Sequence, residues 1–134
     1  MTVTANYVIP MGALEAFYDE PGERGWILEG SKHGLAATSA IVTETAPGGG
    51  PPLHRHHTEE IHVLPECLMG YVMGEMVFDV AGPCVVRIPA ELPHTFLNRG
   101  SSPVRLVCFF PTNDFWTNYE ETGPNPLVAG PAAP

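Results

Sequence analysis

Basic residues are scarce in this sequence. Six Lys and Arg stand against fifteen Asp and Glu among 134 residues, for a formal net charge of −9. A protein that binds nucleic acid by neutralising phosphates, or that docks on an anionic membrane, needs the opposite balance. We therefore expect neither a nucleic-acid partner nor a membrane partner.

Long apolar runs and paired cysteines are also missing. No apolar run approaches the roughly 18 residues of a membrane span, and residues 1–16 lack the basic and apolar regions of a secretory signal. Cys67, Cys84 and Cys108 are odd in number and widely spaced, which favours free, buried thiols over a disulfide. These features predict a cytoplasmic protein.

Glycine and proline, in contrast, are abundant. Fourteen Gly and fifteen Pro run along the whole chain and exclude a helical bundle. From residue 35 to residue 110, apolar segments of five to eight residues end repeatedly at Gly, Pro or Asn. That cadence predicts an all-β sandwich or barrel, and the length predicts one domain over residues 1–134.

The two ends of the chain are less regular. Residues 13–18 are compatible with one or two helical turns, and so are residues 112–122. Residues 26–28 and 35–45 are expected to be strands, because they are rich in β-branched and aromatic residues. The tail, residues 123–134, is expected to be extended or disordered.

Four of the six histidines fall within nine residues. In a strand, side chains two residues apart share a face, so His54 and His56 point the same way, as do Glu60 and His62. Two imidazoles and a carboxylate that converge in a barrel mouth form a transition-metal site. His94, the only other histidine at the start of a strand-like segment, is expected to complete the site. His57 is expected either to be exposed or to lie behind the ligands and support them.

The first part of this pattern resembles the first cupin motif: Gly, five residues, His-x-His, three or four residues, Glu. It is matched here by Gly48, His54, His56 and Glu60. The spacing favours Glu60 over Glu59 as the carboxylate ligand.

The second cupin motif, Pro-x-Gly-x-x-His-x-x-x-Asn, resembles the text from Pro89 to Asn98, with His94 in the histidine position. Glu91 stands where this motif has glycine. Asn98 begins a turn and is expected to fix the loop behind His94.

The resemblance to the cupins covers roughly residues 35–110. It implies a small double-stranded β-helix, or jelly-roll barrel, with short irregular segments at both ends. It also implies one divalent ion per chain, which is Fe, Ni, Mn, Co or Zn, bound inside the barrel by His54, His56, Glu60 and His94. A homodimer that pairs through edge strands or terminal segments is a further implication.

His62 lies two residues after Glu60 on the same face, and its role is open between three possibilities. It is a further metal ligand, a pocket wall, or a general base whose imidazole titrates near neutral pH. The general base is the preferred assignment, which makes His62 the candidate catalytic residue.

Alternation along residues 104–110 places one set of side chains inward, namely Val104, Leu106, Cys108 and Phe110. Soft and aromatic residues of the preceding segments are expected to add to the pocket wall: Met69, Tyr71, Met73, Met76 and Phe78. These residues predict an apolar cavity suited to an aromatic or otherwise hydrophobic small molecule.

Three function classes remain. A metal-dependent oxygenase of the dioxygenase type uses the open positions of the ion for substrate and O₂. A non-redox polyketide cyclase, isomerase or lyase uses the ion to polarise a carbonyl while His62 moves a proton. A small-molecule-binding cupin without turnover ranks last, since all four ligands are present. We expect a metal-dependent enzyme, with the reaction class open and a role in secondary metabolism.

Overall fold

The computed structural model describes residues 7–128. Eleven β-strands and three single-turn 3₁₀ helices make up the regular structure of this part of the chain. The strands are β1 (Glu15–Asp19), β2 (Glu23–Leu28), β3 (Ser39–Thr45), β4 (Leu53–His56), β5 (Glu60–Leu64), β6 (Leu68–Met73), β7 (Met76–Ala81), β8 (Cys84–Ile88), β9 (His94–Asn98), β10 (Val104–Phe110) and β11 (Tyr119–Gly123). The helices are η2 (Met11–Ala13), η3 (Gly30–Lys32) and η4 (Trp116–Asn118).

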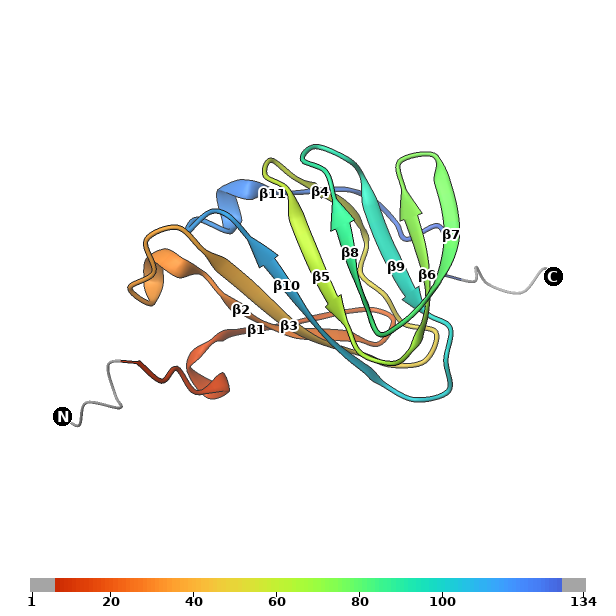
Figure 1. The fold of residues 1–134 in the computed structure, drawn as a ribbon, viewed down its shortest axis with the longest axis horizontal. Helices are drawn as coiled ribbons and strands as arrows, with labels where there is room; N and C mark the ends of the chain where they lie inside the picture. Colours follow the sequence, from red (N-terminus) through yellow and green to blue (C-terminus); the bar gives the residue numbers. More distant parts are fainter. Residues whose placement is uncertain (1–6, 129–134) are drawn as a thin grey trace.

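The strands form two sheets. One has the order β1-β2-β3-β10-β5-β8 and the other the order β11-β4-β9-β6-β7. The β1–β2 hairpin and the β6–β7 hairpin lie at opposite sides of the molecule (Figure 1). Neighbouring strands run antiparallel, so the prediction of an all-β jelly roll is confirmed.

Sequence alternation explains why these segments become strands with one face inward. In β3 and β10 every second residue is buried. The inward set predicted for β10 is confirmed, because its four members are at most 6% exposed. The core lies between the sheets and contains Ile27, Ile41, Leu64, Met69, Tyr71, Phe96, Val104, Leu106, Cys108, Phe110 and Phe115.

The two segments compatible with helical turns are not helical over most of their length. Residues 13–18 enter β1, which pairs antiparallel with β2 along its whole length, so this prediction was wrong. Of residues 112–122, Trp116–Asn118 form a helical turn as expected, and β11 then pairs with β4. Pairing at a sheet edge satisfies the backbone and outweighs a weak local helix preference.

The end of the chain is ordered further than predicted. Residues 124–128 make a turn in which the Asn125 side chain donates to the Phe96 carbonyl oxygen at 2.9 Å. The rest of the predicted extended or disordered tail, residues 129–134, lies outside the described residues.

All three cysteines are free thiols, as predicted, but only Cys108 is buried, while Cys67 and Cys84 are half-buried. Within residues 7–128, no helix has the length and apolar character needed to cross a membrane. The extent of the domain stays a prediction.

Asn98 ties the end of β9 to the neighbouring loops. Its Nδ2 donates to the carbonyl oxygens of Thr45 and Ser102, at 3.0 and 2.8 Å, and its Oδ1 accepts from the Gly100 N–H at 2.9 Å. The side chain is 1% exposed. These contacts agree with the expected role in fixing the loop connected to the strand of His94.

Asn98→Ala should therefore lower the free energy of unfolding by about 1–3 kcal/mol, since it leaves buried backbone groups without partners. The control is Arg99→Ala, which removes only the exposed Arg99–Asp79 ion pair and should cost less than about 1 kcal/mol. Urea denaturation measures both. Equal losses in the two variants would contradict this role of Asn98.

Candidate metal centre

The four predicted ligands come from three strands in two sheets. His54 and His56 lie on β4, His94 begins β9, and Glu60 begins β5 in the opposite sheet. His54 is the register partner of His94. One ligand atom from each of the four side chains lies within 4.8 Å of every other, and all four residues are buried. The structure thus brings together the complete predicted ligand set.

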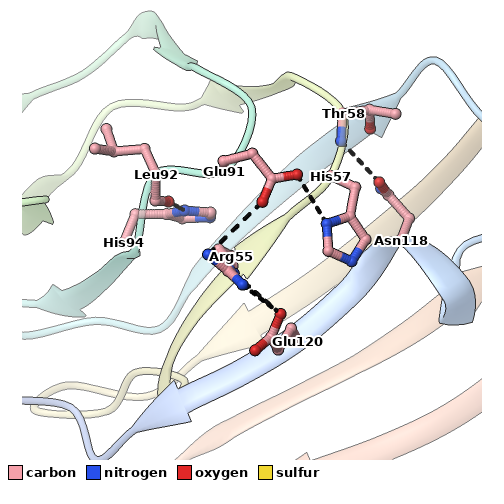
Figure 2. Close-up of polar contacts among 8 residues, drawn as sticks. All are labelled: Arg55, His57, Thr58, Glu91, Leu92, His94, Asn118 and Glu120. Atoms are coloured by element: carbon pink, nitrogen blue, oxygen red, sulfur yellow. Dashed lines mark hydrogen bonds and ion pairs between the residues drawn. The ribbon is translucent and has the colours of Figure 1, made fainter.

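Backbone carbonyls orient two of the rings. His54 Nδ1 donates to the Pro52 carbonyl oxygen at 2.8 Å, and His94 Nδ1 donates to that of Leu92 at 2.7 Å (Figure 2 shows the second contact). Because a carbonyl only accepts, Nδ1 carries the proton in both rings. In the neutral rings, the Nε2 lone pairs are then free to bind a metal ion.

Glu60 supplies the anionic ligand. Its Oε1 lies 2.9 Å from His94 Nε2 and 3.6 Å from His56 Nε2. At 2.9 Å, the lone pairs of Glu60 Oε1 and His94 Nε2 repel each other unless a proton or a cation lies between the two atoms. This donor set, three imidazole nitrogens and one carboxylate oxygen, fits a divalent transition-metal ion.

The protonation states also suit metal binding. Burial, aided by the nearby His94, lowers the pKa of His54 to about 3, and burial lowers the pKa of His56 to about 4. Burial alone would raise the pKa of Glu60, but the surrounding His62, His94 and His56 rings outweigh it and hold that pKa well below its usual range. At neutral pH, His54 and His56 are neutral and Glu60 is a carboxylate.

His62 contacts the other oxygen of the same carboxylate. Its Nε2 lies 3.0 Å from Glu60 Oε2, and its Nδ1 lies 2.9 Å from the Tyr71 hydroxyl. Burial raises the pKa of Tyr71, so its hydroxyl keeps its proton. Both contacts are satisfied when the Tyr71 hydroxyl donates to His62 Nδ1 and the His62 Nε2–H donates to Glu60 Oε2. His62 then fixes the carboxylate through the oxygen that does not contact His94 and His56.

Glu91 occupies the glycine position of the second motif in a left-handed conformation, with φ of 69°. Its N–H donates to the His56 carbonyl oxygen at 2.7 Å. Its carboxylate accepts from His57 Nδ1 at 2.8 Å and lies 3.7 Å from Arg55, which also pairs with Glu120 (Figure 2). These contacts offset the roughly 1–2 kcal/mol that this backbone conformation costs a non-glycine residue. His57 is exposed, which is one of the two expected alternatives.

A cavity of about 280 Å³ opens beside the ligands. Most of its wall is apolar or aromatic, and neither Lys nor Arg contributes to it. Its lining consists of Phe17, Asp19, Glu23, Ile27, Ile41, Thr43, Pro51, His54, His56, Glu60, His62, Phe96, Cys108, Phe115, Trp116, Tyr119 and Glu121.

The predicted cavity wall was only partly correct. Of the four residues expected from β10, only Cys108 lines the cavity, and the five residues expected from β6 and β7 do not. Met69 and Tyr71 are fully buried in the core, and Met76 is 66% exposed. Sequence reasoning also missed Glu23, although the period-two alternation of β2 places it on the inward face with Gly25 and Ile27.

Comparison with known proteins agrees with the geometry. The family described as "Cupin domain" matches residues 41–110, which is a little over half of the chain. No curated protein is significantly similar in sequence.

Several solved structures share the fold. The oxalate decarboxylase of Lactobacillus farciminis, in complex with formate, superposes with a TM-score of 0.72 at 24% identity, over 83% of this chain and 34% of that one. Oxalate decarboxylase from Bacillus subtilis gives 0.70 at 17% identity, over 84% and 30%. A recombinant oxalate oxidase in complex with glycolate gives 0.68 at 18% identity, over 80% and 59%.

This chain thus spans about a third of the length of the two decarboxylases. At these identities the likeness shows the fold alone. With both motifs present, their side chains gathered between two antiparallel sheets, and the family match over more than half of its length, the chain belongs to the cupin family.

Proposed function

We propose that this protein is a metal-dependent enzyme that acts on a small, largely apolar or aromatic molecule. One observation carries the proposal. Three of the four ligand candidates, His54, His56 and Glu60, line the same cavity as His62, and the remaining wall is mostly apolar. His94 offers its ligand atom within 4.8 Å of theirs. A metal centre that borders a mostly apolar pocket is the usual arrangement of a metalloenzyme rather than of a structural metal site.

His54, His56, Glu60 and His94 would hold the ion, which is Fe, Ni, Mn, Co or Zn. When bound, the ion supplies Lewis-acid polarisation of a substrate oxygen or, if it is redox-active, chemistry with O₂. The decarboxylase of Bacillus subtilis has Mn(II) centres, which supports a divalent ion on this fold.

The charge of the cavity wall indicates what the substrate is not. Asp19 and Glu121 contribute carboxylates, and no Lys or Arg side chain balances them. A small dianion such as oxalate finds no Arg or Lys partner there, although the oxalate enzymes share the fold. An uncharged aromatic molecule fits this wall better.

We propose that His62 takes a proton from a substrate carbon and returns it to another position of the substrate during the reaction. The ionised Glu60 at 3.0 Å stabilises the imidazolium that forms when the ring accepts a proton. The Tyr71 hydroxyl fixes the ring orientation. Both ring nitrogens are hydrogen-bonded, so proton uptake requires the Tyr71 contact at Nδ1 to open.

Proton transfer of this kind favours a cyclase, isomerase or lyase, and we place the protein there. Dioxygenase chemistry is the second candidate, because three histidines and one carboxylate also suit iron or nickel. The oxidase among the proteins of similar fold supports that alternative.

We also propose a cytoplasmic homodimer. Exposed apolar side chains gather on the outer face of one sheet: Ile61 and Val63 of β5, Val85 of the edge strand β8, and Phe109 of β10. Each is at least 38% exposed, and register pairing puts them side by side. Covering such a face with a second copy removes it from water.

The metal assignment predicts about one divalent ion per chain in the purified protein. His54→Ala and His94→Ala should lose it on dialysis against a weak chelator, while the exposed His57→Ala should keep it. Elemental analysis measures the metal content, and circular dichroism should show a β spectrum for the metal-free protein because the core is independent of the ion. Full retention of metal by both ligand variants would contradict the assignment.

The role of His62 predicts a loss of proton transfer without loss of metal. Exchange of the acetophenone methyl protons in D₂O, followed by NMR, reports proton abstraction beside a carbonyl. Zn(II)-loaded wild type should accelerate this exchange, and His62→Gln should reduce the acceleration by about 10²-fold with metal content unchanged. His57→Gln is the control.

Other outcomes of that experiment are equally informative. Loss of metal in His62→Gln would make His62 a ligand and end its acid–base role. Unchanged exchange with metal retained would leave it a pocket wall. O₂ uptake by the iron-loaded protein would then make dioxygenase chemistry the better account.

The dimer proposal predicts that wild type elutes at twice the chain mass in light-scattering chromatography. Val63→Lys should give a monomer, since the charge sits in the middle of the apolar face. Val77→Lys, also at an exposed position but on β7 of the other sheet, should stay dimeric. A monomeric wild type, or a dimeric Val63→Lys, would refute this interface.

A further inference from the structure

Two buried polar atoms on the cavity wall away from the metal ligands lack a hydrogen-bond partner. They are Oε2 of Glu23 and Oγ1 of Thr43, and the ligand candidate His56 adds its Nδ1 as a third. Glu23 is 1% exposed and Thr43 is 5% exposed. Buried polar atoms in folded proteins are paired in the large majority of cases, so two unpaired ones on the same cavity indicate a ligand that supplies the partners.

Strand register separates these two residues from the metal ligands. Glu23 of β2 is the partner of Thr45 on β3, and Thr43 lies two residues before Thr45 on the same inward face. His62 aligns through Cys108 with Ile41, two residues earlier still. The cavity therefore runs along the inner face of the sheet, past His62, toward Thr43 and Glu23.

Glu23 is arranged to donate a hydrogen bond. Its Oε1 already accepts from the Thr45 hydroxyl at 2.9 Å. Burial raises the pKa of Glu23 to about 8, the Thr45 bond lowers it in part, and the nearby Asp19 adds to the rise. At neutral pH the side chain is mostly a carboxylic acid, and its free O–H faces the cavity wall. The Thr43 hydroxyl, beside it on β3, both donates and accepts.

We propose that Glu23 and Thr43 form a polar subsite that binds a hydroxyl or carbonyl oxygen of the substrate, away from the metal ligands. The proposal rests on the proposed function, which places the substrate in this cavity. It narrows the substrate class to aromatic molecules with two separate oxygen groups, one directed at the metal centre and one at Glu23 and Thr43.

Neighbouring charges support an uncharged oxygen group at this subsite. Asp19 of β1 and Glu121 of β11 also line the cavity, and their mutual repulsion, after burial, raises the pKa of Asp19. A carboxylate ligand would meet the same repulsion. A phenol or a ketone would not, and it pairs with both a carboxylic acid and a threonine hydroxyl.

Two probes of similar shape test the subsite. p-Cresol carries a hydroxyl where p-xylene carries a methyl group, and binding of each to the purified full-length protein is followed by the backbone amide shifts of Gly25 and Thr43. Glu23→Leu should weaken p-cresol binding by about tenfold and leave p-xylene binding nearly unchanged, since it removes one buried hydrogen bond. Glu23→Gln, which still donates, should retain most of the affinity.

A second variant keeps the test valid if Glu23→Leu folds poorly. Thr43→Val preserves the shape of the side chain and should also weaken p-cresol selectively. Thr38→Val, outside the cavity lining, is the matched control and should change neither probe. Equal effects of the cavity variants on both probes, unchanged p-cresol binding, or no p-cresol shift at Gly25 and Thr43 in wild type would overturn the proposal.

Metal content is measured in the same samples, which separates this proposal from the proposed function. A protein that distinguishes p-cresol through Glu23 but retains no metal would refute the enzyme and keep the subsite. A protein that retains one ion per chain and shows none of these selective effects would refute the subsite alone.

Discussion

The structure depends on one buried carboxylate. Glu60 is 3% exposed and holds its negative charge between histidines of the opposite sheet on one side and His62 on the other. A buried charge is tolerated only with partners, so both sheets must present their imidazoles at the correct register. The pairing of His54 with His94 and the approach of β5 to β4 and β9 bring these imidazoles next to the Glu60 carboxylate.

The two oxygens of Glu60 divide the site into two parts. Oε1 belongs with His94 and His56, whereas Oε2 belongs with His62, which Tyr71 holds in turn. A metal ion on the first side therefore shares its carboxylate with a titratable ring on the second. This shared carboxylate is the physical reason to expect metal chemistry and proton transfer in the same cavity. Glu23 lies on another part of the cavity wall, where it can bind the rest of the substrate.

The strand pattern and the resemblance to two cupin motifs were enough to predict the jelly roll. They also selected four side chains, His54, His56, Glu60 and His94, whose ligand atoms the fold brings within 4.8 Å of one another. They work because they describe a local feature, the face of a strand. They could not predict contacts between residues that lie far apart in the sequence or in different sheets. Tyr71 reaches His62 only through the stacking of two sheets, and the helix expected at residues 13–18 became a strand because β2 lies beside it. Glu23 was missed because only residues 26–28 were expected to be a strand in this segment, and its inward position depends on the pairing of β2 with β3 from Glu23 onward.

The central claim, that Glu60 and three histidines form one metal centre, is tested most directly by X-ray absorption at the edge of the ion in the purified protein. The account predicts a shell of nitrogen and oxygen only, with the multiple scattering of three imidazole rings. A sulfur atom at about 2.3 Å would instead place the ion with Glu60, His62 and Cys108, the other group of possible ligands that meets between the sheets. That result would contradict the assignment of His54, His56 and His94.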